Sequence, residues 1–399
     1  MSVPRFSVVI PTRNRPDVLR FSLQCALAQR FDDFEIVVSD NGTSDASRNV
    51  VSEFNDRRVR YVRTPTMLHM PDSWEFALSH ASGRYVTFLS DDDGISPRLL
   101  ELVDDAIRQS GLEIVAWPFG AVYHHLTSEE VGLRNTLVLE NCDGVRREIS
   151  SAAVLGDLSA ARFTHQLPRL INSCASREVI SDAKKRFGRV FFPSCPDYTV
   201  GVAQLAVRPA LSYLSELVLV WGVCGDSIGY SASKGGAAAQ VFFDELKREN
   251  ADRAEYVPLQ IKTPMNYALD SVLNMKGRAP EELRALEVDW RSYFMVVGRE
   301  LLALEQNGLD IERGLSELRE ALAKQPLDTR LIVSARLLPF PRGAHLRRAA
   351  TRARRHLSSL KRRIRGASQP AGREIFRGER HGFANMFEAA GRLDDLAGR

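Results

Sequence analysis

Three consecutive aspartates, Asp91, Asp92 and Asp93, form the only run of three acidic residues in the chain. They follow the apolar run Tyr85–Leu89, whose β-branched and aromatic residues predict a buried strand. Three adjacent anions repel one another and cannot be buried unless a cation neutralises them. Carboxylate oxygens suit hard divalent ions such as Mg²⁺ or Mn²⁺, and Mg²⁺ usually shares its shell with substrate phosphates. The sequence therefore indicates a metal and phosphate site, with a solvated acidic turn as the alternative.

The segments around these aspartates alternate between strand and helix patterns. Short apolar runs predict strands, and helical spacing fills the segments between them. The expected strands are Phe6–Ile10, Phe34–Val38, Val59–Val62, Tyr85–Leu89 and Glu113–Trp117. This alternation predicts an α/β fold with a mostly parallel sheet covered by helices on both faces. Such sheets bind ligands at the carboxyl ends of their strands, which is where the aspartates fall.

Three motifs at strand ends together carry a family resemblance. They are Ser7–Asn14, Val37–Asp45 and Gly83–Asp93, and they occur in this order. The sequence resembles the family-2 glycosyltransferases, which have the Rossmann-like GT-A fold. The resemblance is close over about the first hundred residues and looser to about residue 235. It implies an inverting transferase that uses a nucleotide-diphospho-sugar donor and a divalent metal, Mn²⁺ or Mg²⁺.

The resemblance also implies roles for residues that bind the nucleotide sugar. Pro11, Thr12 and Arg13 would line the nucleoside pocket at the end of the first strand. Asp40 would contact the base, and because it can accept from a pyrimidine imide N–H it favours uracil or thymine over cytosine. The alternative for Asp40 is turn or helix-cap chemistry, and for Arg13 it is a solvated surface charge.

The acidic triplet would hold the ribose and the metal-bridged diphosphate. The resemblance assigns Asp91 to the nucleotide sugar and Asp92 and Asp93 to the metal. The usual family spacing of two aspartates separated by one residue fits Asp91 and Asp93, whereas alignment of the strand end favours Asp92 as the ligand. Which of the three carboxylates holds the metal therefore stays open.

A second informative stretch lies near residue 197. Pro193 and Pro196 impose an extended approach to a predicted helix that begins with Asp197. An inverting transferase needs a base for the acceptor hydroxyl, and the resemblance places this carboxylate about a hundred residues after the triplet, at Asp197. The family often has an acidic pair here, whereas this chain has Pro196 before the aspartate. A plain helix cap is the alternative for Asp197, and Glu178 and Asp226 are the reserve candidates.

The carboxyl-terminal part is predicted to be helical and then basic. Residues 236–328 predict a small helical bundle that packs on the catalytic domain of residues 1–235 or forms a homodimer. Residues 329–399 predict a basic amphipathic helix at 342–366 and a partly disordered tail with a short helix at Phe383–Leu396. Such a helix is typical of binding to an anionic membrane surface, with a solvated tail as the alternative. Nucleic acid is disfavoured because no aromatic residues are interleaved among the arginines.

The composition excludes several protein classes. Of 399 residues, 44% are hydrophobic and 26% charged, as in ordinary globular chains. The five cysteines are odd in number and form no C-x-x-C pair, so neither a disulfide framework nor a zinc site is indicated. The sequence shows no signal peptide and no apolar run of the roughly 20 residues that span a bilayer. We expect a cytoplasmic protein, or one bound peripherally at the inner face of a membrane.

Together these features predict an inverting glycosyltransferase. It would move a sugar from a UDP- or dTDP-sugar to a hydroxyl of a surface polysaccharide or lipid-linked glycan by single displacement. Within enzymes the alternative is a nucleotidyltransferase, although the loop after the first strand lacks the glycines that it would need. Outside enzymes the alternative is a catalytically silent sugar-nucleotide-binding or scaffold protein.

Overall fold

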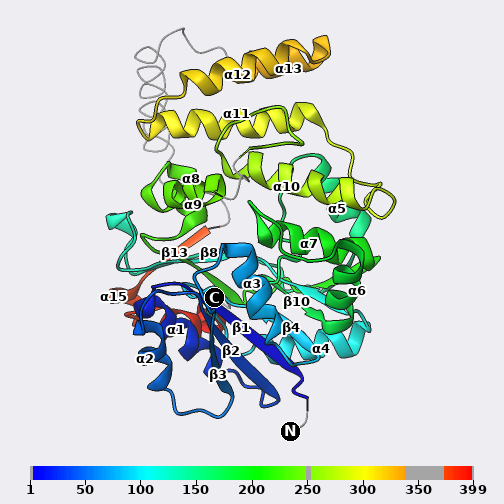
Figure 1. Cartoon of the computed structure of the whole chain (residues 1–399). Coiled ribbons are helices and arrows are strands. Elements are labelled where there is room, and N and C mark those ends of the chain that lie inside the picture. Colours follow the sequence, from blue (N-terminus) through cyan, green and yellow to red (C-terminus); the bar gives the residue numbers. More distant parts are fainter. Residues whose placement is uncertain (1–2, 249–252, 338–372, 398–399) are drawn as a thin grey trace.

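The computed structural model describes residues 3–248, 253–337 and 373–397, and its centre is an eight-stranded mixed sheet (Figure 1). Neighbouring strands run parallel from β3 to β4 and again between β6 and β11, whereas β10 and β9 are antiparallel to their neighbours. In spatial order the strands are β3 (Val59–Arg63), β2 (Phe34–Asp40), β1 (Phe6–Thr12), β4 (Tyr85–Phe88), β10 (Ser173–Ser176), β6 (Ile114–Ala116), β11 (Ala210–Tyr213) and β9 (Arg147–Ser150).

Helices cover both faces of this sheet because its buried strands are apolar on both sides. In β1, Val8 and Ile10 belong to one core cluster with α1, α2 and α4, whereas Val9 belongs to the cluster with α3, α5, α6 and α7. The predicted α/β fold class is confirmed. The helices are α1 (Pro16–Leu27), α2 (Ala46–Ser52), α3 (Met70–Ser79), α4 (Leu99–Ser110), α5 (Ser151–Ser159), α6 (Arg177–Phe187) and α7 (Pro196–Val207).

A smaller five-stranded sheet lies against the acidic triplet. Strand β12, the fourth of the five, pairs in parallel with β7 and antiparallel with the edge strand β5, the short strand that begins directly after Asp93. A single 3₁₀ turn, Val131–Leu133, lies between β7 and β8. The spatial order is β13 (Arg373–Arg377), β8 (Thr136–Glu140), β7 (Ala121–His124), β12 (Leu219–Val223) and β5 (Gly94–Ile95).

The helical region after β12 lies beyond the carboxyl edge of the large sheet and ends in a layer of long helices (Figure 1). This confirms the predicted helical region. No helix in the described ranges is long and apolar enough to span a membrane. The helices are α8 (Ile228–Lys234), α9 (Ala237–Arg248), α10 (Pro264–Arg278), α11 (Trp290–Gln306), α12 (Glu312–Ala323) and α13 (Leu327–Leu337).

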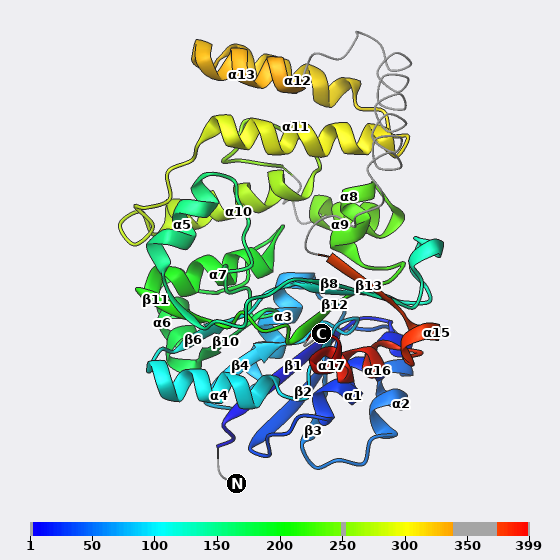
Figure 2. The same ribbon diagram turned by 180° about the vertical axis from the view of Figure 1, so that it is seen from behind.

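The last described segment returns to the domain of the large sheet, on the side of α1 (Figure 2). After β13 come α15 (Gly378–His381), α16 (Met386–Gly391) and α17 (Leu393–Ala397), and Met386 and Leu393 are completely buried in the core that includes α1. Residues 373–397 are thus a folded part of this domain. The helices α16 and α17 confirm the short helix expected at 383–396, whereas the rest of this segment is more ordered than the predicted tail. The predicted basic helix at 342–366 lies outside the described residues.

Candidate active site

The guanidinium of Arg15 lies among the carboxylates of the acidic triplet. Arg15 precedes α1 and forms ion pairs with Asp91 and Asp92, the latter with 3.2 Å between Nη1 and Oδ2. Thr12, the last residue of β1, donates its hydroxyl to Asp91 Oδ2 at 2.7 Å. The three aspartates are at most 6% exposed. A buried anionic cluster needs a cation, and within this structure a side chain from the loop after β1 supplies it.

Asp92 and Asp93 also accept hydrogen bonds from residues on the opposite side of the site. Asp92 Oδ2 accepts the Ser227 hydroxyl at 2.7 Å, and the Cys224 thiol lies 3.4 Å from the same oxygen. Asp93 Oδ1 accepts the backbone N–H of Gly222 at 2.8 Å. The triplet therefore joins the loop after β1 to strand β12 and to the turn that leads into α8.

Strand β12 approaches the triplet so closely that only glycine fits at Gly222. A Cβ atom at this position would lie 1.6 Å from the carbonyl oxygen of Asp92. His125 Nε2 donates to the same carbonyl at 2.8 Å. The backbone of the triplet is thus held from two sides, and its side chains have fixed directions.

Burial and mutual repulsion shift the pKa values of the three aspartates in different directions. Burial and the neighbouring charge of Asp92 raise the pKa of Asp91 to about 6, although Arg15 and Thr12 oppose this shift. Burial and the same charge also raise the pKa of Asp93. Arg15 and Ser227 outweigh burial at Asp92 and hold its pKa below the usual range. Asp92 is therefore the carboxylate that most readily carries the negative charge.

The triplet fits a divalent metal that shares its shell with a substrate. Across the described part of the chain, no three His, Cys, Asp or Glu side chains are arranged to hold a metal by themselves. The oxygen donors nevertheless match Mg²⁺ or Mn²⁺ in kind, and Mg²⁺ is commonly held by one or two carboxylates together with substrate phosphates. The predicted ligands Asp92 and Asp93 fit that arrangement, with Asp91 beside them.

Asp40 ends strand β2 next to this cluster and is completely buried. Its Oδ1 accepts the N–H of Gly42 at 2.7 Å, and its Oδ2 accepts the Tyr61 hydroxyl at 2.7 Å. The neighbouring loop is held by Asn14 Oδ1, which accepts the N–H of Thr43 at 2.9 Å. Asp40 thus organises the turn after β2, and each of its oxygens retains a lone pair for a further donor.

The segment α8–α9 lies over the ends of β1 and β12. Arg13 forms a bidentate pair with Glu245 of α9, with the shorter N–O distance at 2.7 Å. Lys234, at the end of α8, pairs with Glu130 at 3.3 Å. Arg13 therefore lies at the strand end as predicted, whereas the charge of Lys234 is partly neutralised by a protein carboxylate.

A second cluster surrounds Asp197 in the first turn of α7. The Arg169 guanidinium lies 3.5 Å from Asp197 Oδ2 and stacks over the rings of Phe119 (4.2 Å) and Tyr198 (5.0 Å). The Arg169 and Asp197 side chains are 15% and 20% exposed, and Arg169 Nε is buried without a hydrogen-bond partner. Burial raises the pKa of Asp197, and the charge of Arg169 opposes that shift.

The sheet topology places the two clusters at one edge. Because β10 is antiparallel to both β4 and β6, the carboxyl ends of β4 and β6 and the start of β10 share an edge. The triplet follows β4, Phe119 follows β6, and Arg169 precedes β10. Helix α7 leads into β11, which is parallel to β6, so its first turn with Asp197 also lies at this edge.

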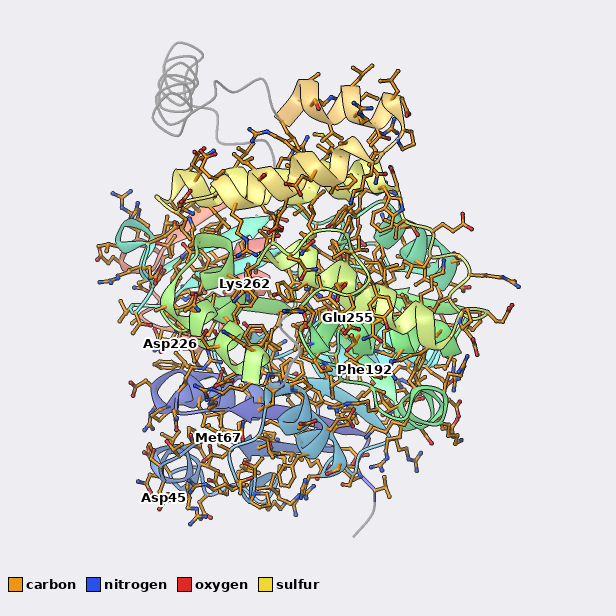
Figure 3. The ribbon with its side chains drawn as sticks, turned by 45° about the horizontal axis from the view of Figure 1, so that its top comes forward. Asp45, Met67, Phe192, Asp226, Glu255 and Lys262 are labelled. Carbon is orange, nitrogen blue, oxygen red and sulfur yellow. The ribbon has the colours of Figure 1, made fainter. Side chains whose placement is uncertain are left out.

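The two reserve candidates are both exposed. Glu178 lies in the first turn of α6, and Asp226 lies in the loop before α8. In Figure 3, Asp226 lies well apart from Phe192, which precedes the helix of Asp197. Asp197 is thus the candidate base that is largely buried and paired with a cation.

Arg15 and Arg169 are the two cations beside the site carboxylates, and sequence reasoning gave neither of them a role. A signal existed for Arg15, because the buried anions required a cation and the loop after β1 carries two arginines. Arg169 lies in a stretch without readable periodicity, so no sequence signal distinguishes it from a surface arginine.

The fold and the site define an α/β protein with a buried acidic cluster at the carboxyl edge of its sheet. Residues 7–138 match the family described as Glycosyl transferase family 2. This match covers about a third of the chain and includes all three motifs, so it confirms over these residues the predicted resemblance to the family-2 glycosyltransferases.

Two curated relatives illustrate the similarity. A GalNAc(5)-diNAcBac-PP-undecaprenol beta-1,3-glucosyltransferase of Campylobacter jejuni is 37% identical over 121 residues, which are 30% of this chain and 38% of the relative. The UDP-Glc:alpha-D-GlcNAc-diphosphoundecaprenol beta-1,3-glucosyltransferase WfgD of Escherichia coli is 31% identical over 87 residues, 22% of this chain and 34% of the relative. The chain thus spans little more than a third of either relative.

Among solved structures, residues 1–349 of S. aureus TarS in complex with UDP match 85% of this chain and 93% of that chain. The identity is 17% and the TM-score 0.46. At this level of likeness neither ligands nor site residues transfer to the present chain.

Proposed function

We propose that this protein is an inverting glycosyltransferase that moves a sugar from a UDP- or dTDP-sugar to a hydroxyl of a lipid-linked glycan. The observation that carries the proposal is the shared edge of the sheet, where the acidic triplet and the paired carboxylate Asp197 both lie. The names of both relatives, which include an undecaprenol diphosphate, support a lipid-linked acceptor.

The donor would bind at the ends of β1, β2 and β4. Pro11, Thr12 and Arg13 would line the nucleoside pocket and Asp40 would accept from the base, in line with their positions at these strand ends. The leaving diphosphate would lie at the triplet, where Asp92 with Asp91 or Asp93 would hold Mn²⁺ or Mg²⁺. The metal would supply the positive charge that stabilises the leaving diphosphate.

The acceptor would bind on the side of α7. Asp197 would take the proton of the acceptor hydroxyl while that oxygen bonds to the anomeric carbon from the face opposite the diphosphate. The bond from the anomeric carbon to the diphosphate oxygen breaks in the same step, so the configuration inverts. Arg169 supports this role, because its charge favours the ionised form of a carboxylate whose pKa is raised by burial.

The proposal also includes where the enzyme works in the cell and whether it forms a homodimer. An acceptor on a polyprenyl diphosphate would require the enzyme to work at a membrane surface, for which the sequence offers the basic stretch 342–366. We propose a peripheral protein at the inner face of the membrane. A homodimer through the helical region is a further expectation from the sequence.

The test is transfer from UDP-sugars to a polyprenyl-diphosphate-linked sugar, followed by chromatography of the product. Asp197→Asn should abolish transfer while UDP with Mn²⁺ still raises the melting temperature. Glu178→Gln is the matched control, since Glu178 has the same place in the first turn of α6, and it should transfer normally. Full transfer by Asp197→Asn would exclude the assigned base. No thermal stabilisation by any nucleoside diphosphate, with or without Mn²⁺, would count against the donor site.

A further inference from the structure

The helix farthest along the helical region, α13, has two apolar faces. One face packs in the core with α11 and α12 through Val333 and Leu337. The opposite face carries Leu327 and Leu331, which are 66% and 62% exposed, and the exposed Ala335. These three residues recur every four positions and therefore form one outward stripe along the helix. We call Leu327, Leu331 and Ala335 the α13 stripe.

A basic groove lies beside this stripe. It has a volume of about 460 Å³ and lies between α11, α13 and the end of α5. Its lining combines the apolar Met295 with exposed arginines, and Arg291, Met295 and Arg299 are spaced four residues apart on one face of α11. At 1.5 Å per residue the two arginines lie about 12 Å apart along the helix. The four arginines of the groove are Arg162, Arg291, Arg299 and Arg336.

Two of these arginines have an acidic neighbour and two do not. Arg162 pairs with Asp157 at 2.6 Å, and the charge of Arg291 helps to lower the pKa of Asp289. Arg299 and Arg336 form no ion pair with any residue of the described ranges. The groove thus presents unbalanced positive charge, and no acidic residue lines it.

The chain that follows continues this charge. Between residues 338 and 372 the sequence contains ten arginines and lysines and no acidic residue. An exposed aliphatic stripe flanked by cations is the pattern of a helix that lies in a membrane interface. Arginine also recognises phosphate groups with a bidentate fork. Charge and apolarity therefore both match the surface of an anionic bilayer.

We propose that the α11–α13 face docks on an anionic lipid bilayer. The α13 stripe enters the interface, and Arg299 and Arg336 bind lipid phosphate groups. This surface lies in the helical region and contains none of the residues assigned to catalysis, so the proposal does not depend on the sugar donor, the acceptor or the base. It adds a folded docking surface to the basic stretch of the sequence.

The test is co-sedimentation of the full chain with vesicles of phosphatidylcholine alone or mixed with phosphatidylglycerol. The wild-type chain should bind the mixed vesicles and lose binding as salt is raised. A basic residue near an anionic surface contributes roughly fivefold to binding. The double variant Arg299→Gln, Arg336→Gln should therefore bind about 25-fold more weakly. The double variant Leu327→Ser, Leu331→Ser should also lose binding, because it removes the part that enters the interface.

Matched controls exist for both variants. Arg313→Gln removes a 90% exposed arginine of α12 that is paired with Glu317, and Val241→Ser removes a 57% exposed aliphatic side chain of α9. Both should bind vesicles as the wild-type chain does. Circular dichroism of each variant checks the fold.

Three results would overturn the proposal. Unchanged vesicle binding by both double variants would assign all binding to other parts of the chain. Equal binding of the wild-type chain to both vesicle types would remove the role of charge. Loss of self-association in the Leu327→Ser, Leu331→Ser variant, with vesicle binding unchanged, would show that a second copy of the chain covers the stripe.

Discussion

Replacing Arg169 by methionine should shift the pH dependence of transfer. Methionine keeps much of the apolar packing between Phe119 and Tyr198 but removes the cation beside Asp197. Without that cation the ionised form of Asp197 loses a stabilising partner, so its pKa rises. The acid limb of kcat/KM should therefore move to higher pH, and activity should recover when the pH is raised.

The magnitude follows from the geometry. Two unit charges 3.5 Å apart interact by roughly 1 kcal/mol in water and roughly 5 kcal/mol at an effective dielectric constant of 20. Both side chains are partly exposed (15% and 20%), so we take about 2 kcal/mol, which is about a thirtyfold change in proton binding. Arg169→Lys keeps the charge and should return the acid limb most of the way toward that of the wild-type enzyme.

The assay is kcat/KM for transfer across the pH range, with Arg162→Met as control. Arg162 is an exposed arginine with its own partner, Asp157, so its loss should leave the profile unchanged. Coinciding acid limbs for Arg169→Met and the wild-type enzyme would refute the electrostatic role of Arg169. A merely structural role would lower kcat/KM equally at every pH. Failure of the base assignment is a separate outcome, since it would appear as full transfer by Asp197→Asn.

Three further predictions concern the scaffold. Gly222→Ala should cause loss of UDP–metal stabilisation and a lower melting temperature, because its Cβ would meet the Asp92 carbonyl, whereas Gly229→Ala, with open space around it, should change neither. Met386→Ala should cost about 2–5 kcal/mol of unfolding free energy in a denaturant titration, because Met386 is completely buried. Burial raises the pKa of Glu300 from 4.5 to about 7, so the stability that Glu300 contributes is fully present below about pH 4.5 and falls by roughly 3 kcal/mol as the pH rises through 7. Melting temperatures of Glu300→Gln should not show that dependence.

The strand ends could be predicted because their signals are local. The run Tyr85–Leu89 and the aspartates after it are close together in the sequence. The apolar residues that predict α1 and α7 likewise lie within the segment that forms each helix. Proline marks both helix starts, at Pro16 and Pro196, as expected for a residue that fits the first turn. These signals located the edge of the sheet and the residues that stand on it.

The partners of these residues could not be predicted because they are distant in the sequence. Asp93 accepts from Gly222, which lies 129 positions later, and Asp92 accepts from Ser227, which lies 135 positions later. Arg15 likewise reaches Asp91 across 76 positions. Neither periodicity nor composition states which distant side chain closes such a contact. The need for a cation was therefore predictable, whereas its identity was not.

The carboxyl-terminal segment shows the same difficulty for a domain boundary. Its composition predicted a tail, yet β13 pairs with β8, and Met386 packs where a side chain at Gly94 would lie. The sheet that holds Gly222 against the triplet thus contains strands from residue 94 to residue 377. A catalytic unit cut after residue 235 would lack β13 and the helix that carries Met386. Residues 373–397 therefore help to hold the acidic triplet in place, although the first of them lies about 280 positions beyond it.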